Sequence, residues 1–110
     1  MRTLKFIVEG QSIFLDPSCD FSGLVPGTEG YLTAEFAFSH EWDGCIKVAA
    51  FYSNLGTEYE PQIINERDNS CLIPFEALIK SIFKVQIIGR KSGCMLRTNK
   101  VKVHQKGGKV

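Results

Sequence analysis

The stretch that decides the fold is SHEWDGCIKVAAFY, which covers residues 39–52. It contains the only tryptophan of the chain, Trp42, followed by the turn-forming pair Asp43-Gly44 and by eight residues rich in apolar and β-branched types. A period-two pattern over residues 31–38, typical of a half-buried strand, ends where this stretch begins. The sequence therefore predicts a strand, a short connection and a second strand, with Trp42 packed between two sheets.

The two strands around this connection differ in their patterns. Residues 31–38 have one clearly apolar face, which we assign to the core. Residues 45–52 are apolar on both faces, which is typical of a central strand or of a strand whose outer face is covered. One face carries Ile46, Val48 and Ala50, and the other carries Lys47, Ala49 and Phe51. We assign the face of Val48 to the core.

The same periodicity predicts further strands. They cover residues 3–8, 13–15, 59–65, 71–73, 82–89 and 94–103. Pro61 indicates that its strand lies at a sheet edge, because proline has no N–H for a neighbouring strand. A change of apolar parity near Thr98-Asn99 predicts a β-bulge in the last strand. Pro74 is typical of a first helical position, so residues 74–80 are expected to form one or two helical turns between the sheets.

Together these elements predict an all-β fold, an antiparallel β-sandwich of about seven strands with one short helical turn. A tryptophan just before the middle strand favours an immunoglobulin-like plan, although the strands at 31–38 and 82–89 lack the cysteines of antibody domains. A small β-barrel is the alternative. We expect one domain over residues 1–103 and a flexible basic tail over residues 104–110.

The predicted strand faces define two sets of residues. The expected structural core comprises Leu32, Phe36, Phe38, Trp42, Val48, Phe83, Val85 and Ile87. The second, apolar faces supply a possible interface, which comprises Ile7, Ala37, Ala49, Phe51 and Ile88.

Composition excludes several classes of partner. Thirteen basic and twelve acidic residues give a net charge of +1, which is not the basic footprint expected of a nucleic-acid-binding protein. No apolar run approaches the roughly 20 residues of a membrane span, and the first residues do not resemble a secretory leader. The four cysteines are far apart and form no C-x-x-C pair, so we expect free thiols and no bound metal or other cofactor.

Candidate catalytic residues are few. Ser39, His40 and Asp43 lie in one short run, whereas a catalytic triad is assembled from distant segments. The acidic residues from 58 to 68 lack the spacing of a calcium-binding loop, so we interpret them as a solvated edge. The carboxyl-terminal lysines and arginines are interpreted as a solvated face, with an acidic partner surface as the other reading. We therefore expect a protein without enzymatic activity.

A set of short elements occurs in a distinctive order. Ala34-Glu35-Phe36 leads into Glu41-Trp42-Asp43-Gly44, and later come Cys71-Leu72-Ile73-Pro74 with Glu76-Ala77-Leu78, a strand over 83–89, and Leu96-Arg97-Thr98-Asn99. Over roughly residues 30–103, this order resembles the small immunoglobulin-like domains of tailed bacteriophages. Notable examples are the amino-terminal domain of baseplate upper proteins and related tail-fibre or head-fibre proteins.

The resemblance implies a non-catalytic structural or binding module of a bacteriophage particle, in the tail, the baseplate or the head. Such a module is made in the host cytoplasm and docks on other virion proteins and on further copies of itself, without binding nucleic acid or a membrane. The alternative is a small phage-encoded inhibitor that binds a host defence protein.

Overall fold

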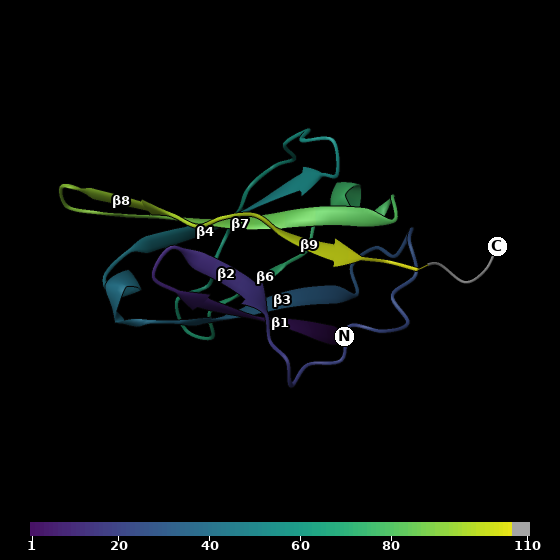
Figure 1. Ribbon diagram of the computed structural model, residues 1–110, viewed down its shortest axis with the longest axis horizontal. Helices are drawn as coiled ribbons and strands as arrows, with labels where there is room; N and C mark the ends of the chain where they lie inside the picture. Colours follow the sequence, from purple (N-terminus) through teal and green to yellow (C-terminus); the bar gives the residue numbers. More distant parts are fainter. Residues whose placement is uncertain (107–110) are drawn as a thin grey trace.

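The computed structural model describes residues 1–106, which form two β-sheets packed face to face (Figure 1). The first sheet has the strand order β2-β1-β3-β6, and the second has the order β5-β4-β7-β8, with β9 also paired to β7. The strands of the first sheet are β1 (Arg2–Glu9), β2 (Ser12–Leu15), β3 (Leu32–Phe38) and β6 (Ser70–Leu72). Those of the second are β4 (Ile46–Ser53), β5 (Gln62–Ile63), β7 (Ile82–Lys91), β8 (Cys94–Arg97) and β9 (Val101–His104).

This arrangement confirms the predicted all-β sandwich, and the sheets do not close into a barrel. The number of strands is nine instead of about seven, because several are very short. The predicted helical turn after Pro74 is the 3₁₀ helix η2 (Phe75–Leu78), which links the last strand of the first sheet to β7 of the second. A further 3₁₀ turn, η1 (His40–Trp42), connects β3 to β4.

One strand pair is parallel, whereas all the others are antiparallel. β1 runs alongside β3 in the same direction, with Phe6 opposite Phe36. The chain reaches this pairing because the long loop after β2 returns to the beginning of β1, where the Arg2 N–H donates to the Tyr31 carbonyl at 2.9 Å. Phe21 in that loop packs edge-on against Phe6, with ring centroids 5.7 Å apart. The loop therefore closes one end of the core.

Trp42 lies fully buried between the sheets, as predicted. Its indole Nε1 donates to the carbonyl of Gly10 at 2.8 Å, while the Gly10 N–H donates to Ser39 Oγ at 2.9 Å. Gly10 forms the tight β1–β2 turn with a φ of +56°, a conformation that glycine adopts without steric cost. The β3–β4 connection is thus bonded to the β1–β2 hairpin through both backbone polar groups of Gly10.

Gly89 of β7 packs directly against the indole ring. A Cβ atom at this position would lie 2.7 Å from Trp42 Cζ3 and 3.2 Å from Cys45 Cβ. Both neighbours are buried, so neither can move into solvent. The absence of a side chain at Gly89 is therefore what allows the tryptophan to sit against the second sheet.

Replacing Gly89 with alanine is expected to destabilise the protein by about 1–3 kcal/mol, the usual cost of overpacking a core. In an ordinary strand the same change is stabilising, because glycine loses more backbone entropy on folding. Urea denaturation followed by circular dichroism measures the effect. In a Trp42→Leu background the cost of Gly89→Ala should shrink, since the clashing ring atoms are gone. Equal costs in both backgrounds would show that the ring is not the obstacle.

The face of β4 that we assigned to the core is wrong. Ala49 and Phe51, predicted to form an interface, are fully buried in the core, whereas Val48 is only half-buried and points outward beside the exposed Ile46. Lys47 shares the inner face, which made that face look like the polar one. Its ammonium group escapes burial because it lies near the end of the strand, 5.1 Å from the Phe38 ring centroid.

The predicted bulge near Thr98-Asn99 is confirmed. Arg97 of β8 pairs with Ile88 of β7, and Val101 of β9 pairs with Val85. Residues 98–100 therefore lie opposite only two residues of β7, at positions 86 and 87. Within the bulge, Asn99 bonds to the edge strand β2. Its Oδ1 accepts from the Ile13 N–H at 2.8 Å and its Nδ2 donates to the Ile13 carbonyl at 3.3 Å. One side chain thus joins the edges of the two sheets.

The predicted domain boundary after residue 103 comes too early. His104 belongs to β9, and Gln105 is buried, with its Nε2 donating to the carbonyls of Leu78 at 3.1 Å and Lys80 at 2.8 Å. These bonds attach the end of β9 to the end of η2. Residues 107–110 of the predicted tail lie outside the described residues.

Candidate docking surface

The predicted core is largely where the sequence places it. Six of its members are buried: Leu32, Phe36, Trp42, Phe83, Val85 and Ile87. Phe38 is half-buried at the margin, with its ring centroid 5.6 Å from that of Trp42. Val48 is the one member that points away from the core.

The predicted interface does not form one surface. Ala49 and Phe51 are in the core, as described above. Ile7 and Ala37 lie opposite each other on the outer face of the first sheet, and Ile88 lies on the outer face of the second. The remaining three residues thus belong to two surfaces on opposite sides of the molecule.

The outer face of the second sheet carries a contiguous apolar surface, which we call the aliphatic patch and define as Ile46, Val48, Ile63 and Ile88. Val48 pairs with Ile63 on one side and with Ile88 on the other, so the patch crosses three adjacent strands. Ile46 is 65% exposed and Ile63 is 76% exposed. Sequence reasoning missed both, although Ile46 shares the face of Val48 and Ile63 follows the edge residue Pro61.

Basic side chains surround the patch. Arg90 pairs with Ile46, and Arg97 pairs with Ile88, so both lie on the same outer face. Further along the sheet, the Lys100 ammonium lies 3.9 Å from the ring centroid of Tyr52, a cation–π contact. Lys84 pairs with Tyr52 and also with Lys102. The face therefore combines an apolar centre with a mainly positive margin.

Tyr52 holds this margin in place. Its hydroxyl donates to Gln86 Oε1 at 2.7 Å, and Gln86 Nε2 donates to the Thr98 carbonyl at 2.7 Å within the bulge. Burial raises the pKa of Tyr52, and the nearby carboxylate of Glu58 raises it further, so the hydroxyl stays protonated and able to donate. This chain of bonds fixes the β9 side of the outer face to the centre of the sheet.

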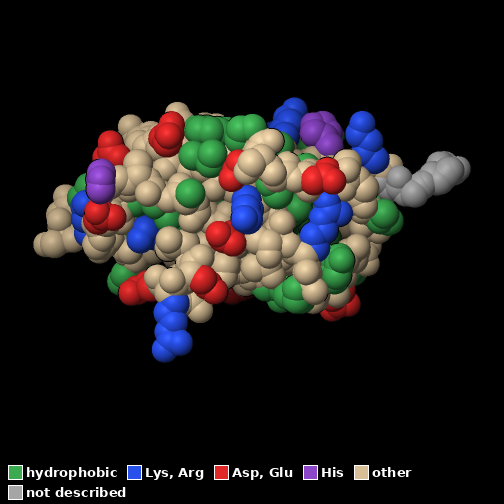
Figure 2. All heavy atoms as spheres, turned by 90° about the horizontal axis from the view of Figure 1, so that it is seen from below, with side chains coloured by type: hydrophobic (Ala, Val, Ile, Leu, Met, Phe, Trp, Pro, Cys, Tyr) green, Lys and Arg blue, Asp and Glu red, His purple; other side chains and the backbone are tan. Residues whose placement is uncertain are grey.

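The outer face of the first sheet carries a second apolar surface, with carboxylates beside it. Phe14, Ile7 and Ala37 form a row across β2, β1 and β3, which we call the apolar row. Glu9 and Glu35 lie on the same face, and Lys5 pairs with Glu35. Figure 2, viewed from this side, shows acidic and basic groups interspersed among small hydrophobic areas.

Ser39, His40 and Asp43 do not form a catalytic arrangement. His40 Nδ1 lies 3.4 Å from Asp43 Oδ2 on the exposed surface, while Ser39 Oγ donates to Glu41 Oε1 at 2.6 Å. That hydrogen bond is the largest of the effects that lower the pKa of Glu41. Ser39 therefore serves the connection, because its hydroxyl joins Glu41 to the Gly10 N–H. Within residues 1–106, no three acidic, histidine or cysteine side chains come together as a metal site.

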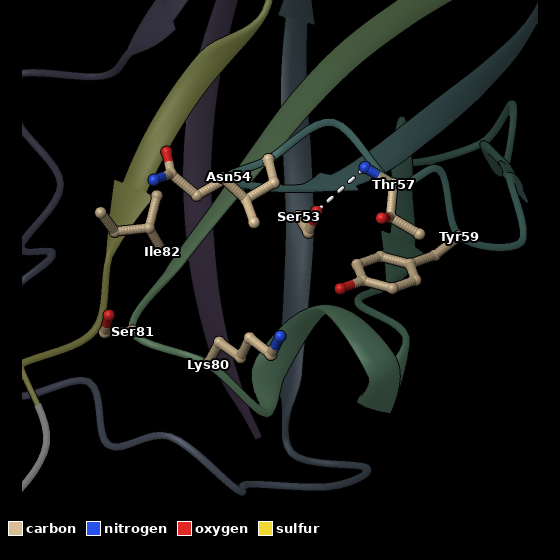
Figure 3. Close-up of a pocket in the computed structure, with 8 residues that line it drawn as sticks. Ser53, Asn54, Thr57, Tyr59, Lys80, Ser81 and Ile82 are labelled. Carbon is tan, nitrogen blue, oxygen red and sulfur yellow. Dashed lines mark hydrogen bonds between the residues drawn. The ribbon is translucent and has the colours of Figure 1, made fainter.

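A hollow of about 480 Å³ opens at the end of the sandwich, between the β4–β5 loop and the start of β7. Figure 3 shows Lys80 and Tyr59 directed toward it from two sides, with Ser53 between them. Ser53 Oγ accepts from the Thr57 N–H at 2.9 Å, so this group is used to close the loop. Lys80 and Thr57 are exposed and Ser53 is used within the loop, so the hollow is a weaker candidate for binding than the aliphatic patch.

All four cysteines are free thiols in the structure, as predicted. Cys94 is exposed, Cys19 is half-buried, and Cys45 and Cys71 are buried. Burial raises the pKa of Cys71 to about 12, so almost none of it is thiolate near neutral pH.

Iodoacetamide should therefore modify Cys94 first in the native protein, while Cys71 reacts only when the protein unfolds. Peptide mass spectrometry after a series of reaction times gives the order. A sample in concentrated urea is the control, and there all four thiols should react. Rapid native labelling of Cys71 would contradict its burial in the sandwich.

Comparisons of the chain with protein-family models, with curated proteins and with solved structures found no match in any of the three. Across residues 1–106, no helix has the length and apolar character needed to cross a membrane.

Proposed function

We propose that this protein is a non-catalytic docking module of a bacteriophage particle, which binds other virion subunits through the outer face of its second sheet. The aliphatic patch is the observation that carries the docking role. The sequence resemblance to phage immunoglobulin-like domains supports the location in a particle.

The patch is unfavourable in water. Ile46 and Ile63 are largely exposed on the adjacent strands β4 and β5, where their side chains point away from the core. Covering apolar surface contributes roughly 25 cal/mol per Å², so a partner that buries these side chains gains stability. Contiguous exposed apolar surface with a polar margin is typical of protein interaction sites.

The surrounding framework suits a docking role as well. Three of the four patch residues lie on β4 and β7, whose inner faces form the core with Phe51 and Val85. Because those inner side chains are locked by packing, the patch is presented on a rigid surface. A rigid surface loses little conformational entropy on binding, which favours affinity.

Mass spectrometry of purified particles from the phage that encodes the chain tests the proposal. The protein should be present in a fixed ratio to known structural subunits. An Ile46→Asn, Ile63→Asn variant should be depleted from particles, whereas Leu55→Asn, at an exposed leucine outside the patch, should be retained. Absence of the chain from particles, with abundance in infected cells, would overturn the proposal and favour the inhibitor hypothesis.

A further inference from the structure

We propose that copies of this chain stack face to back, with the aliphatic patch of one copy packed on the apolar row of the next. This inference takes the docking role as its premise and identifies the partner of the patch as a second copy of the chain. It does not depend on the location of the protein in a particle.

The strand edges are poor sites for self-association. Asn99 and Gln11 occupy the edge of β2: the Asn99 side chain bonds to Ile13, and the Asn99 N–H donates to the Gln11 carbonyl at 3.2 Å. In the second sheet, the edge strand β5 has only two residues and follows Pro61. Short, interrupted or covered edges resist strand addition, which disfavours pairing of a second copy at β2 and β5.

The two apolar surfaces match in length. The patch crosses three neighbouring strands through Ile63, Val48 and Ile88, and the row crosses three through Phe14, Ile7 and Ala37. With strands about 4.8 Å apart, each of these lines is roughly 10 Å long. A sheet face packed on a sheet face can therefore bury both lines together.

Charge decides which faces meet. The outer face of the second sheet carries basic side chains around its patch: Lys84, Arg90, Arg97, Lys100 and Lys102. Glu58, bridged to Tyr52, is the acidic residue near them. Two such faces would repel each other, because a two-fold contact between identical faces brings the basic margins together.

The first sheet supplies the complementary charge. Glu9 and Glu35 lie on its outer face, and Asp16 lies beside Lys5. Hydrogen bonds from Ser18 are the largest cause of the lowered pKa of Asp16, and the charge of Lys5 lowers it further. Around the apolar row, these three carboxylates outnumber the one lysine, Lys5, so the margin of the row is acidic. Packing it on the basic face of another copy places opposite charges at the margins and apolar side chains in the centre.

A face-to-back contact has a distinct consequence for assembly. Each copy uses one face to bind the preceding copy and keeps the other face free, so the contact does not close at two copies. The expected products are rings or linear stacks whose size grows with concentration. High salt should weaken them, because the marginal charges are exposed.

Sedimentation velocity of the purified chain, over a range of concentrations at low and high salt, tests this inference. The weight-average mass should rise beyond that of a dimer at low salt and fall at high salt. Ile63→Glu on the patch and Ala37→Lys on the row should each weaken self-association about tenfold or more. Each substitution places a charge in the contact, where it faces like charges at the margin of the other copy. Leu55→Glu is the control and should associate as the unmodified chain does.

An equimolar mixture of the Ile63→Glu and Ala37→Lys variants gives the sharpest result. Each variant retains one intact face, so the mixture should form heterodimers that neither variant forms alone. Circular dichroism confirms that both variants are folded. A chain that stays monomeric at every concentration, or a closed dimer that Ala37→Lys leaves intact, would overturn the inference. The docking role itself would survive that outcome, because it is tested separately by incorporation into particles.

Discussion

Replacing Trp42 with alanine is expected to lower the free energy of unfolding by about 3–5 kcal/mol, the range for truncating a large buried aromatic side chain. The loss has two parts. The ring fills the space between Phe38 and Gly89, and its Nε1–H satisfies the Gly10 carbonyl. Leaving that carbonyl unpaired costs roughly 1–3 kcal/mol where water cannot reach it. Small domains are stable by about 5–15 kcal/mol in total, so this variant should be partly unfolded at physiological temperature.

Far-ultraviolet circular dichroism in urea is the appropriate measurement, because the variant lacks the only tryptophan and has lost its intrinsic fluorescence probe. Trp42→Phe is the matched control. It retains an aromatic ring but loses the donor to Gly10, so its cost should be smaller than that of alanine. A loss below about 1 kcal/mol for Trp42→Ala would contradict the central position of the ring, since surface substitutions fall in that range.

Replacing Phe51 with alanine should cost about 3–5 kcal/mol, whereas Val48→Ala on the same strand should cost about 1 kcal/mol or less. Phe51 is fully buried, with its ring centroid 6.2 Å from that of Phe83. Val48 faces outward and is only half-buried. The two side chains differ in size, but the predicted ratio of the two losses of stability is much larger than that difference in size explains.

Urea midpoints of the two variants, measured side by side, test the inner and outer faces of β4. Ile88→Ala serves as a second outward control on β7. If Val48→Ala lowered the stability more than Phe51→Ala, the inner and outer faces of β4 would have to be exchanged, and the aliphatic patch would become part of the core.

Much of the fold follows from the sequence because alternation is unambiguous in β3 and β7, where polar residues mark the outer face. The buried Trp42 and the bulge at Thr98-Asn99 were predictable for the same reason: each interrupts a regular pattern at one place. This reasoning fails for β4, because a strand that is apolar on both faces shows no alternation of apolar and polar residues. Lys47 then points to the wrong face, since a long side chain near the end of a strand can reach solvent from the inner side.

Other features depend on contacts between distant segments that no local pattern reports. The parallel pairing of β1 with β3 arises from the path of the loop before Tyr31. The role of Gly89 depends on a ring 47 positions earlier in the chain. The docking surface was only partly predictable for the same reason. Ile88 was identified from its own strand, but Ile63 joins it only through the register of β5 on β4.

The bond from Asn99 to Ile13 also constrains how the chain folds during synthesis. These two residues are 86 positions apart, and β9, which follows Asn99, supplies the buried Val103. A nascent chain that ends before this point has an open edge on β2 and a gap in the core. Ribosomes add about 5–20 residues per second, so the amino-terminal strands wait several seconds for their last partners. Folding of the sandwich should therefore begin only after β9 has been synthesised, and it should be slow, as expected for a topology dominated by distant pairings.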